Sequence, residues 1–319
     1  MAAFSPPLDA ADVVYERARE NARDHTRLVG EIIDYTGRQL RLRTAGDRER
    51  TIDAEKIVRV ETTRTAEQTA ADALFTRGDF AAAGARYEAA LQKEPRRWVR
   101  REIIAQVVWC RRALGQLERA GQYFVLLYDQ DPTTQMVDCI PLAWYGDPLA
   151  PSLERQARSW LAKDSLPVEK LLGASHLLAT GDGRQAAIDA LDTLATGRDG
   201  RIAALATAQL WRTALVTARA EDVQRWQAQL QQMDEPLRAG PYYLLGRARV
   251  RLKQYEAGAL ALLHVPALYG KDRQLSAASL YEAGRALQAL EREEEAAEIF
   301  RQLVAEHPRS PWTDLVRVK

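Results

Sequence analysis

The fold is decided by the segment LLGRARVRLKQYEAGALALL (residues 244–263), in which a polar turn separates two stretches rich in small and apolar residues. Its key positions recur 38 residues later: Leu245-Gly246, Tyr255, Gly258 and Leu262 become Ala283-Gly284, Glu293, Ala296 and Phe300, and Pro308 ends the second copy. Self-similarity at a fixed period of about 20–50 residues is typical of stacked supersecondary units. Each copy here predicts a hairpin of two helices.

A second pair of copies follows the start of the helical sequence. Its members match at an offset of 37: Arg77-Gly78-Asp79-Phe80, Ala83, Tyr87 and Pro95 become Leu114-Gly115-Gln116-Leu117, Ala120, Phe124 and Pro132. Small residues let antiparallel helices approach closely, aromatic residues fill the seam, and proline stops the second helix. These positions resemble the tetratricopeptide repeat, a helix-turn-helix unit of about 34 residues.

The resemblance implies a mainly α fold, an α-solenoid of antiparallel helix hairpins. We expect five or six hairpins in two arrays, one at residues 64–135 and a more divergent one at 151–319. The stretch between them, residues 136–150, is apolar and carries Pro141 and Pro148, so it has no room for a helix. We predict an irregular break that packs against the solenoid. The alternative is that it lies in the groove and mimics a bound peptide.

The N-terminal part has a different pattern of polar and apolar residues. Residues 1–11 are expected to be a flexible N-terminus, and residues 12–62 hold about five short segments with strand character. Gln39-Leu40-Arg41-Leu42-Arg43 alternates polar and apolar side chains, as a strand with one buried face does. The order of strands and turns resembles an Sm-like barrel, and we therefore predict a small all-β barrel-like domain before the solenoid.

Charge and composition exclude several classes of protein. Lys plus Arg number 45 against 44 Asp plus Glu, so the net charge of +1 creates no chain-wide field for nucleic acid or an anionic membrane. No run of 18 apolar residues occurs, and we predict no membrane span. Residues 1–11 lack the pattern of a secretory signal, which favours the cytoplasm. If Met1 was added to a signal-cleaved mature chain, the compartment is the periplasm or the exterior.

The chain carries no pattern of an enzyme. The four histidines lie far apart in the sequence, and no phosphate loop, nucleophile elbow or zinc-binding pair is present. We expect no catalytic residue, no metal and no cofactor. Cys110 and Cys139 are too few for a disulfide scaffold or a four-thiolate zinc site. A single bridge between these two cysteines stays open.

One basic cluster has a mechanism for binding RNA. Arg96, Arg97, Trp98, Arg100 and Arg101 place four guanidinium groups around one indole, and arginine grips phosphates and stacks on bases. Residues 1–62, however, hold 11 Lys plus Arg against 12 Asp plus Glu, so the predicted barrel is not basic. We favour a helix start whose arginines pair with acids such as Glu94 and Glu102. An RNA-associated protein is the alternative function.

The main prediction is a non-enzymatic scaffold that binds a protein or peptide. In the tetratricopeptide resemblance, the first helix of each repeat lines a concave groove. The groove positions of the last two copies are Tyr243, Arg247, Val250, Arg251, Tyr281, Arg285 and Gln288. Tyrosine and arginine dominate binding hot spots, and arginine pairs with carboxylates. This strip would suit an extended acidic or C-terminal peptide, while the N-terminal barrel could serve self-association.

Overall fold

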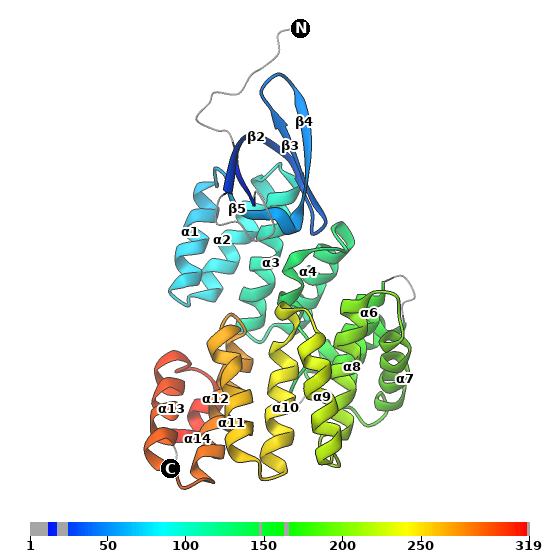
Figure 1. Cartoon of the computed structure of the whole chain (residues 1–319), viewed down its shortest axis with the longest axis vertical. Coiled ribbons are helices and arrows are strands. Elements are labelled where there is room, and N and C mark those ends of the chain that lie inside the picture. The colour runs from blue at the N-terminus through cyan, green and yellow to red at the C-terminus, as the bar shows by residue number, and fades with distance from the viewer. Residues whose placement is uncertain (1–11, 18–24, 147–148, 163–165, 318–319) are drawn as a thin grey trace. The chain divides into compact units, whose positions relative to one another are not determined.

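The chain folds into two compact units, each with its own apolar core. The computed structural model describes residues 12–17, 25–146, 149–162 and 166–317 (Figure 1). The first unit comprises residues 1–114 and 122–136, and the second comprises 115–121 and 137–319. The boundaries predicted from the sequence for the two arrays and the break stay predictions.

The N-terminal domain is one antiparallel sheet of five strands in the order β4-β3-β2-β1-β5. The strands are β1 (Asp12–Arg17), β2 (His25–Tyr35), β3 (Gln39–Thr44), β4 (Arg48–Asp53) and β5 (Ile57–Glu61). The predicted alternation in β3 is confirmed: Leu40 and Leu42 have no exposed surface, while Arg41 and Arg43 point outward to Glu49. The small β domain is thus present as predicted.

The strand β2 is shared between two parts of this sheet. Residues up to Gly30 pair with β1, and residues from Glu31 onward pair with β3. A Cβ atom on Gly30 would lie 2.2 Å from the carbonyl oxygen of Arg43, so only glycine lets β3 approach at this point. The sheet folds over a small apolar core whose fully buried members are Val14, Ile32, Leu40, Leu42 and Ile52.

The sheet is not closed, and this corrects the prediction of a barrel. Among the described residues β4 and β5 are the two edges and do not pair with each other. The physical reason is the link between β4 and β5. This link, the 3₁₀ helix η2 (Ala54–Lys56), leads the chain across the sheet, so that β5 pairs with β1. The prediction that this domain mediates self-association stays a prediction.

The regular secondary structure in the rest of the described chain is helical, so the fold is mainly α, as predicted. In the first unit the helices are α1 (Ala66–Thr76), α2 (Phe80–Lys93), α3 (Arg97–Ala113) and most of α4 (Leu117–Gln130), followed by the 3₁₀ helix η3 (Gln135–Cys139). The second unit contains α5 (Pro151–Ala162), α6 (Pro167–Leu177), α7 (Arg184–Ala195), α8 (Gly200–Ala214), α9 (Ala220–Gln232), η4 (Glu235–Leu237), α10 (Ala239–Arg251), α11 (Tyr255–Leu268), α12 (Arg273–Gln288), α13 (Glu293–Glu306) and α14 (Pro311–Arg317).

Four helix-to-helix turns share one backbone feature that follows the sequence repeat. Gly78, Gly115, Lys253 and Glu291 each have a φ angle between 61° and 78°, the left-handed conformation. Glycine adopts this conformation without cost, whereas Lys253 and Glu291 adopt it because the turn demands it. The residues within each pair are separated by the 37 and 38 residues of the sequence repeat. The repeated hairpin predicted from the sequence is therefore confirmed in its turns as well as its helices.

The β domain and the first helices share one apolar core. Val14 and Leu40 of the sheet belong to the same buried cluster as Tyr87 and Trp98 of α2 and α3. Polar contacts add to this core: the Asp131 carboxylate accepts a hydrogen bond of 2.8 Å from the backbone N–H of Gly37 in the β2–β3 turn. A Cβ atom on Gly37 would lie 1.6 Å from the Thr133 carbonyl oxygen, so the turn packs directly on backbone.

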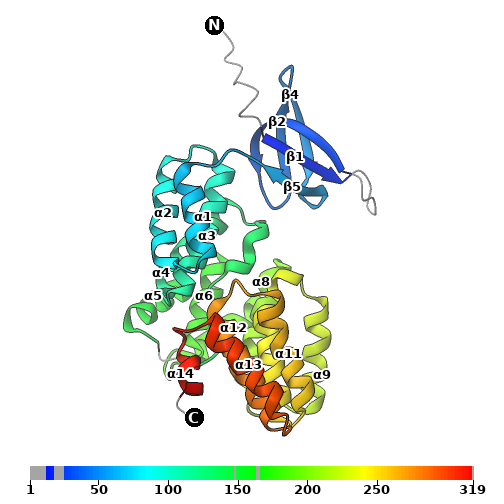
Figure 2. The same ribbon diagram turned by 90° about the vertical axis from the view of Figure 1, so that its left-hand side faces the viewer.

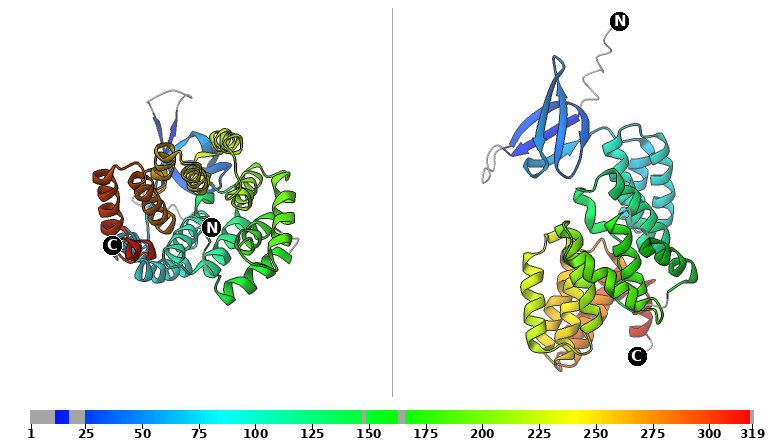
Figure 3. Two further views of the ribbon diagram at one scale, coloured as in Figure 1. Left: turned by 90° about the horizontal axis from the view of Figure 1, so that it is seen from below. Right: turned by 90° about the vertical axis from the view of Figure 1, so that its right-hand side faces the viewer.

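In the second unit, α6 to α13 follow one another as an antiparallel stack (Figures 2 and 3). Glycines allow the closest approaches within it. A Cβ atom on Gly246 of α10 would lie 2.6 Å from the Leu262 side chain of α11, and one on Gly284 of α12 would lie 2.4 Å from the Phe300 ring of α13. Each contact lies within one hairpin, and the two contacts occupy equivalent positions of successive hairpins, as expected for repeats.

Candidate functional site

A segment without regular secondary structure, residues 140–146, contacts the first helices α6, α8 and α10 of the second unit. Ala143 is its anchor: its N–H donates to Ser175 Oγ of α6 at 2.9 Å, and its carbonyl accepts from Gln209 Nε2 of α8 at 3.1 Å. Ser175 Oγ in turn donates to Gln209 Oε1 at 3.0 Å, which orients both groups. Two successive first helices thus form hydrogen bonds with both backbone polar groups of one residue. This is the way a receptor holds a peptide main chain.

Two aromatic side chains extend this contact to α10 and α14. Trp144 packs on Gly240, where a Cβ atom would lie 2.0 Å from the indole ring. The Tyr145 ring lies edge-on to Tyr243 of α10 and to Trp312 of α14, with ring centroids 6.2 and 5.9 Å apart. Trp144 is 6% exposed, so the segment covers the helices rather than projecting from them.

His176 of α6 fixes the start of the segment and is buried with it. Its Nε2 lies 3.0 Å from the carbonyl oxygen of Pro141, and since a carbonyl only accepts, Nε2 carries the proton. Burial, with a smaller contribution from the nearby Arg212 charge, lowers the pKa of His176 to about 4. Burial likewise lowers the pKa of His307 in the same unit to about 4. Both imidazoles are therefore neutral in the folded protein at pH 7.

These two histidines predict acid sensitivity of the second unit. In the unfolded chain a histidine titrates near pH 6.5, so between pH 6.5 and 4 the unfolded state binds more protons than the folded one. Above pH 6.5 each neutral histidine makes its full contribution to the free energy of unfolding. As the pH is lowered from 6.5 toward 4, that free energy falls by about 1.4 kcal/mol per pH unit for each histidine. Urea titrations between pH 7 and 4.5 measure this slope. A double variant, His176→Gln and His307→Gln, should have a smaller slope, and an equal slope would contradict the assignment.

Two of the predicted groove residues of α10, Tyr243 and Arg247, lie at the end of this segment. Tyr243 has no exposed surface, because the Tyr145 ring lies against it and the Arg247 guanidinium lies over its ring at 5.6 Å. Arg247 is partly exposed and lies 3.7 Å from the Glu282 carboxylate of α12. Val250 packs into the apolar cluster between α11 and α13. Arg251 is exposed and donates to the carbonyl oxygen of Ala218.

The predicted residues of α12 are more accessible. The Tyr281 ring packs against Trp312, with centroids 5.3 Å apart, and remains partly exposed. Arg285 is exposed and donates to the Tyr281 hydroxyl at 3.4 Å, while Gln288 is half-buried. Tyr281 and Arg285 thus lie together, and their use by a partner stays a prediction.

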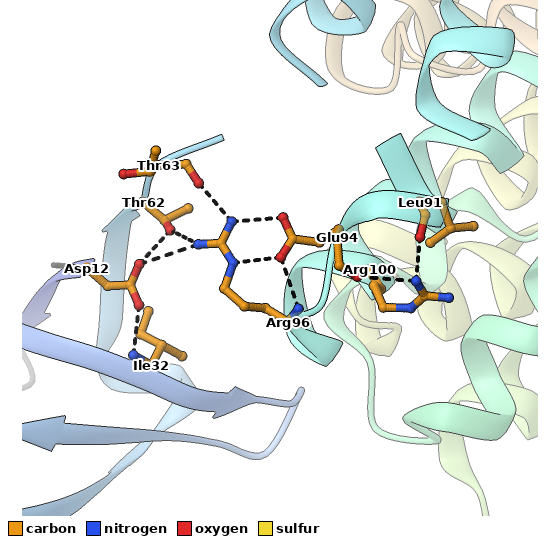
Figure 4. A network of polar contacts seen from close by, with 8 residues as sticks. All are labelled: Asp12, Ile32, Thr62, Thr63, Leu91, Glu94, Arg96 and Arg100. Carbon is orange, nitrogen blue, oxygen red and sulfur yellow. Dashed lines mark hydrogen bonds and ion pairs between the residues drawn. The ribbon is translucent and has the colours of Figure 1, made fainter. Parts of the chain in front are cut away.

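The basic cluster at the start of α3 holds the first unit together (Figure 4). Arg96 makes three hydrogen bonds to the buried Glu94 carboxylate and two more to Thr62 and to the Thr63 carbonyl oxygen, at the end of β5. The Arg96 hydrogen bonds hold the pKa of Glu94 below its usual range. Asp12 of β1 lies 3.8 Å from the same guanidinium and accepts from Ile32 N–H and from the Thr62 hydroxyl. Arg96 therefore links two strands to α3.

The other members of the cluster are also used internally. Arg100 donates to the carbonyl oxygens of Leu91 and Glu94, and Arg101 is 4% exposed, with Asp34 and the Tyr35 carbonyl as acceptors. Trp98 is 1% exposed. Only Arg97 of the five is exposed. The RNA-binding alternative has no support here, because three of the four arginines that would grip phosphate are already bonded to protein.

Other expectations have plain outcomes. Cys110 and Cys139 are both buried and form no disulfide with each other, and burial raises the pKa of Cys110 to about 12. No helix within the described ranges is long and apolar enough to cross a bilayer. In the same residues no group of three or more His, Cys, Asp or Glu gathers as metal ligands do.

The residues that bind the extended segment were not predicted from the sequence. Ser175 and Gln209 lie in the divergent repeats, where no offset pointed to them. One signal was available: each is a polar residue on an otherwise apolar helix face, since Ser175 and Gln209 have no exposed surface. A buried polar side chain demands a partner, and here the partner is the main chain of residue 143.

Comparison with known proteins agrees with the repeat geometry. Residues 278–310, which include most of α12 and all of α13, match the family model described as tetratricopeptide repeat. No curated protein matches the chain. The matched residues are the hairpin that carries Tyr281, Arg285 and Gln288.

Proposed function

We propose that this chain, a tetratricopeptide repeat protein with a small β domain, is a non-enzymatic scaffold that holds an extended peptide of a protein partner on the first-helix face of its second unit. The repeat is in general a protein-interaction module, because stacked hairpins build extended binding surfaces. The peptide lies along α10 and α12, where Arg247, Arg251, Tyr281 and Arg285 contact it.

The observation that supports this proposal is the pair of hydrogen bonds that Ser175 and Gln209 form with the backbone of Ala143. A face that bonds both the N–H and the carbonyl of one residue recognises main chain, which every peptide has. The segment ends beside Tyr243 and Trp312, and the proposed peptide site continues from there along α10 and α12.

Charge favours an acidic peptide. Arg247, Arg251 and Arg285 lie on these two helices, and among the ion pairs of the described residues only Glu282 faces one of them, at 3.7 Å. Arginine forms strong, directional hydrogen bonds to carboxylates, and a tyrosine beside it adds apolar contact area.

Affinity capture followed by mass spectrometry tests the proposal. A double variant, Arg251→Glu and Arg285→Glu, should lose a partner that the wild-type chain captures, by about tenfold or more, since like charges replace attractive ones. The matched control is Arg225→Glu with Arg301→Glu, which reverses two exposed arginines on the second helices α9 and α13. A partner retained equally by both double variants, or lost equally from both, would refute the groove as the binding site. Circular dichroism verifies that each variant is folded.

A further inference from the structure

The helix α11, the second helix of its hairpin, has an apolar outer surface. Its exposed residues are Glu256, Leu260, Ala267 and Leu268, and the two leucines are 61% and 60% exposed. No other helix among the described residues has more than one large apolar side chain that is exposed. Single exposed leucines are common on proteins, whereas several on one element mark an interaction surface.

The corresponding helices of the flanking hairpins show that the repeat does not require this surface. Apart from alanines, the exposed residues of α9 and α13 are all charged or glutamine. In contrast, α11 has 14 residues, and Glu256 is its only carboxylate, with no lysine or arginine. A helix that is apolar on every side is normally covered on every side. The outer side of α11 therefore resembles half of an interface.

Aromatic rings widen the apolar surface. The Nδ1 atom of His264 lies 2.8 Å from the Leu260 carbonyl oxygen and donates to it, which holds the imidazole against its own helix. The ring stacks on Tyr242 of α10, with centroids 4.6 Å apart, and the Tyr242 ring lies 6.2 Å from that of Tyr269. All three rings are partly exposed, and Tyr269 follows Leu268 directly in the chain.

The order of residues along this side of α11 is self-complementary. Six residues at spacings of three and four share it, and we call them the α11 face: Glu256, Leu260, Leu263, His264, Ala267 and, in the turn after the helix, Lys271. When the order is reversed about the bond between Leu263 and His264, Glu256 coincides with Lys271. In the same reversal Leu260 coincides with Ala267. An acidic end thus matches a basic end, and a large side chain matches a small one.

We infer that the α11 face is the contact between two copies of this chain, which pack antiparallel about a two-fold axis beside Leu263 and His264. A two-fold interface uses the same patch on both copies, so the patch must complement itself. In this register each Leu260 packs on Ala267 of the other copy, and the small residue lets the helices approach to about 8–10 Å.

Charge fixes the direction of the pair. The Glu256 side chain is 83% exposed, and its contact with Arg292 at 3.4 Å is an exposed pair that contributes little. It can therefore accept from Lys271 of the other copy, once at each end of the interface. A parallel pair would place the two Glu256 side chains together, and like charges oppose that arrangement. A contact of two helices is small, so we expect a dissociation constant of about micromolar.

Sedimentation velocity of the full chain from about 1 to about 100 μM tests the inference, and we expect a monomer–dimer equilibrium in this range. The variant Leu260→Glu should weaken the dimer at least about tenfold, because it buries two carboxylates without partners. The matched control Val216→Glu replaces a side chain that is 77% exposed in the turn after α8, and it should leave the dimer unchanged. A chain that stays monomeric, or a dimer that Leu260→Glu leaves unchanged, would overturn the inference.

A charge exchange tests the antiparallel register. Glu256→Lys and Lys271→Glu each oppose like charges at both ends, so each should weaken the dimer about tenfold. The double variant should return to within about threefold of the wild type, because it restores both attractive pairs. The control Glu298→Lys on α13 changes an exposed glutamate that also neighbours an arginine, and it should have no effect. A double variant as weak as the single ones would refute the register.

The dimer goes beyond the proposed function and does not depend on it. The α11 face lies on a second helix, whereas the proposed peptide site lies on the first helices α10 and α12, so a dimer would carry two peptide sites. Circular dichroism verifies that each variant is folded. Because these measurements use no partner protein, they can fail while the groove variants still lose a captured protein, and the reverse outcome would refute the proposed function alone.

Discussion

Replacing Gly173 by leucine should destabilise the second unit by more than about 3 kcal/mol. Gly173 lies in the middle of α6, and a Cβ atom there would lie 2.5 Å from the Ala157 carbonyl oxygen and 2.6 Å from the Leu161 nitrogen of α5. Both are backbone atoms, which cannot rotate away as a side chain does. The two helices would have to separate, and the apolar residues between them would lose contact.

Urea unfolding and hydrogen exchange measure this effect. The control is Gly200→Leu at the start of α8, where an added Cβ atom meets nothing within 4 Å and leucine is a better helix former than glycine. We expect the control to change the stability by less than about 0.5 kcal/mol. If the two variants had equal stability, the interpretation that α5 packs closely on α6 at Gly173 would be wrong.

Replacing Arg101 by methionine should destabilise the first unit by about 2–3 kcal/mol. The side chain is almost fully buried, and its guanidinium donates to the Asp34 carboxylate and, at 2.8 Å, to the Tyr35 carbonyl at the end of β2. Methionine fills much of the same space but leaves both acceptors without their donor. The Asp34 side chain is about one-third exposed, so water compensates part of the loss.

Hydrogen exchange of β2 and β3 locates the effect, because the lost contacts join β2, which pairs with β3, to α3. The matched control is Arg43→Met on β3, whose ion pairs with Glu31, Asp47 and Glu49 are all solvent-exposed. Exposed pairs contribute about 0–1 kcal/mol, so the control should remain close to the wild type. Equal losses from the two variants would mean that Arg101 does not anchor the sheet.

Much of the fold could be predicted from residue patterns. The hairpins followed from small residues at fixed offsets, because close helix packing admits little else at Gly246, Gly258 and Gly284. The strands followed from alternation, as in Leu40 and Leu42. Because both patterns are local or periodic, they can be recognised in a single sequence.

The candidate site could be predicted only in part. Placing Tyr243 and Tyr281 at equivalent positions of two first helices followed from the repeat, but the cover that Tyr145 forms over Tyr243 did not. That contact joins residues almost a hundred positions apart. The basic cluster shows the same limit, since Arg96 and Arg101 meet strands that precede them by more than thirty residues.

By itself, the sequence determined which residues form helices and strands, where the hairpin turns lie and which positions must be small. These properties depend on neighbours within a few turns of the chain and on a repeated period. The tertiary structure alone decided that Arg96 and Arg101 bind protein rather than phosphate, and that residues 140–146 cover the α6, α8 and α10 face. Each of these results depends on contacts between residues that are far apart in the sequence. The role of a charged group or a buried amide is set by the protein group that replaces water as its partner.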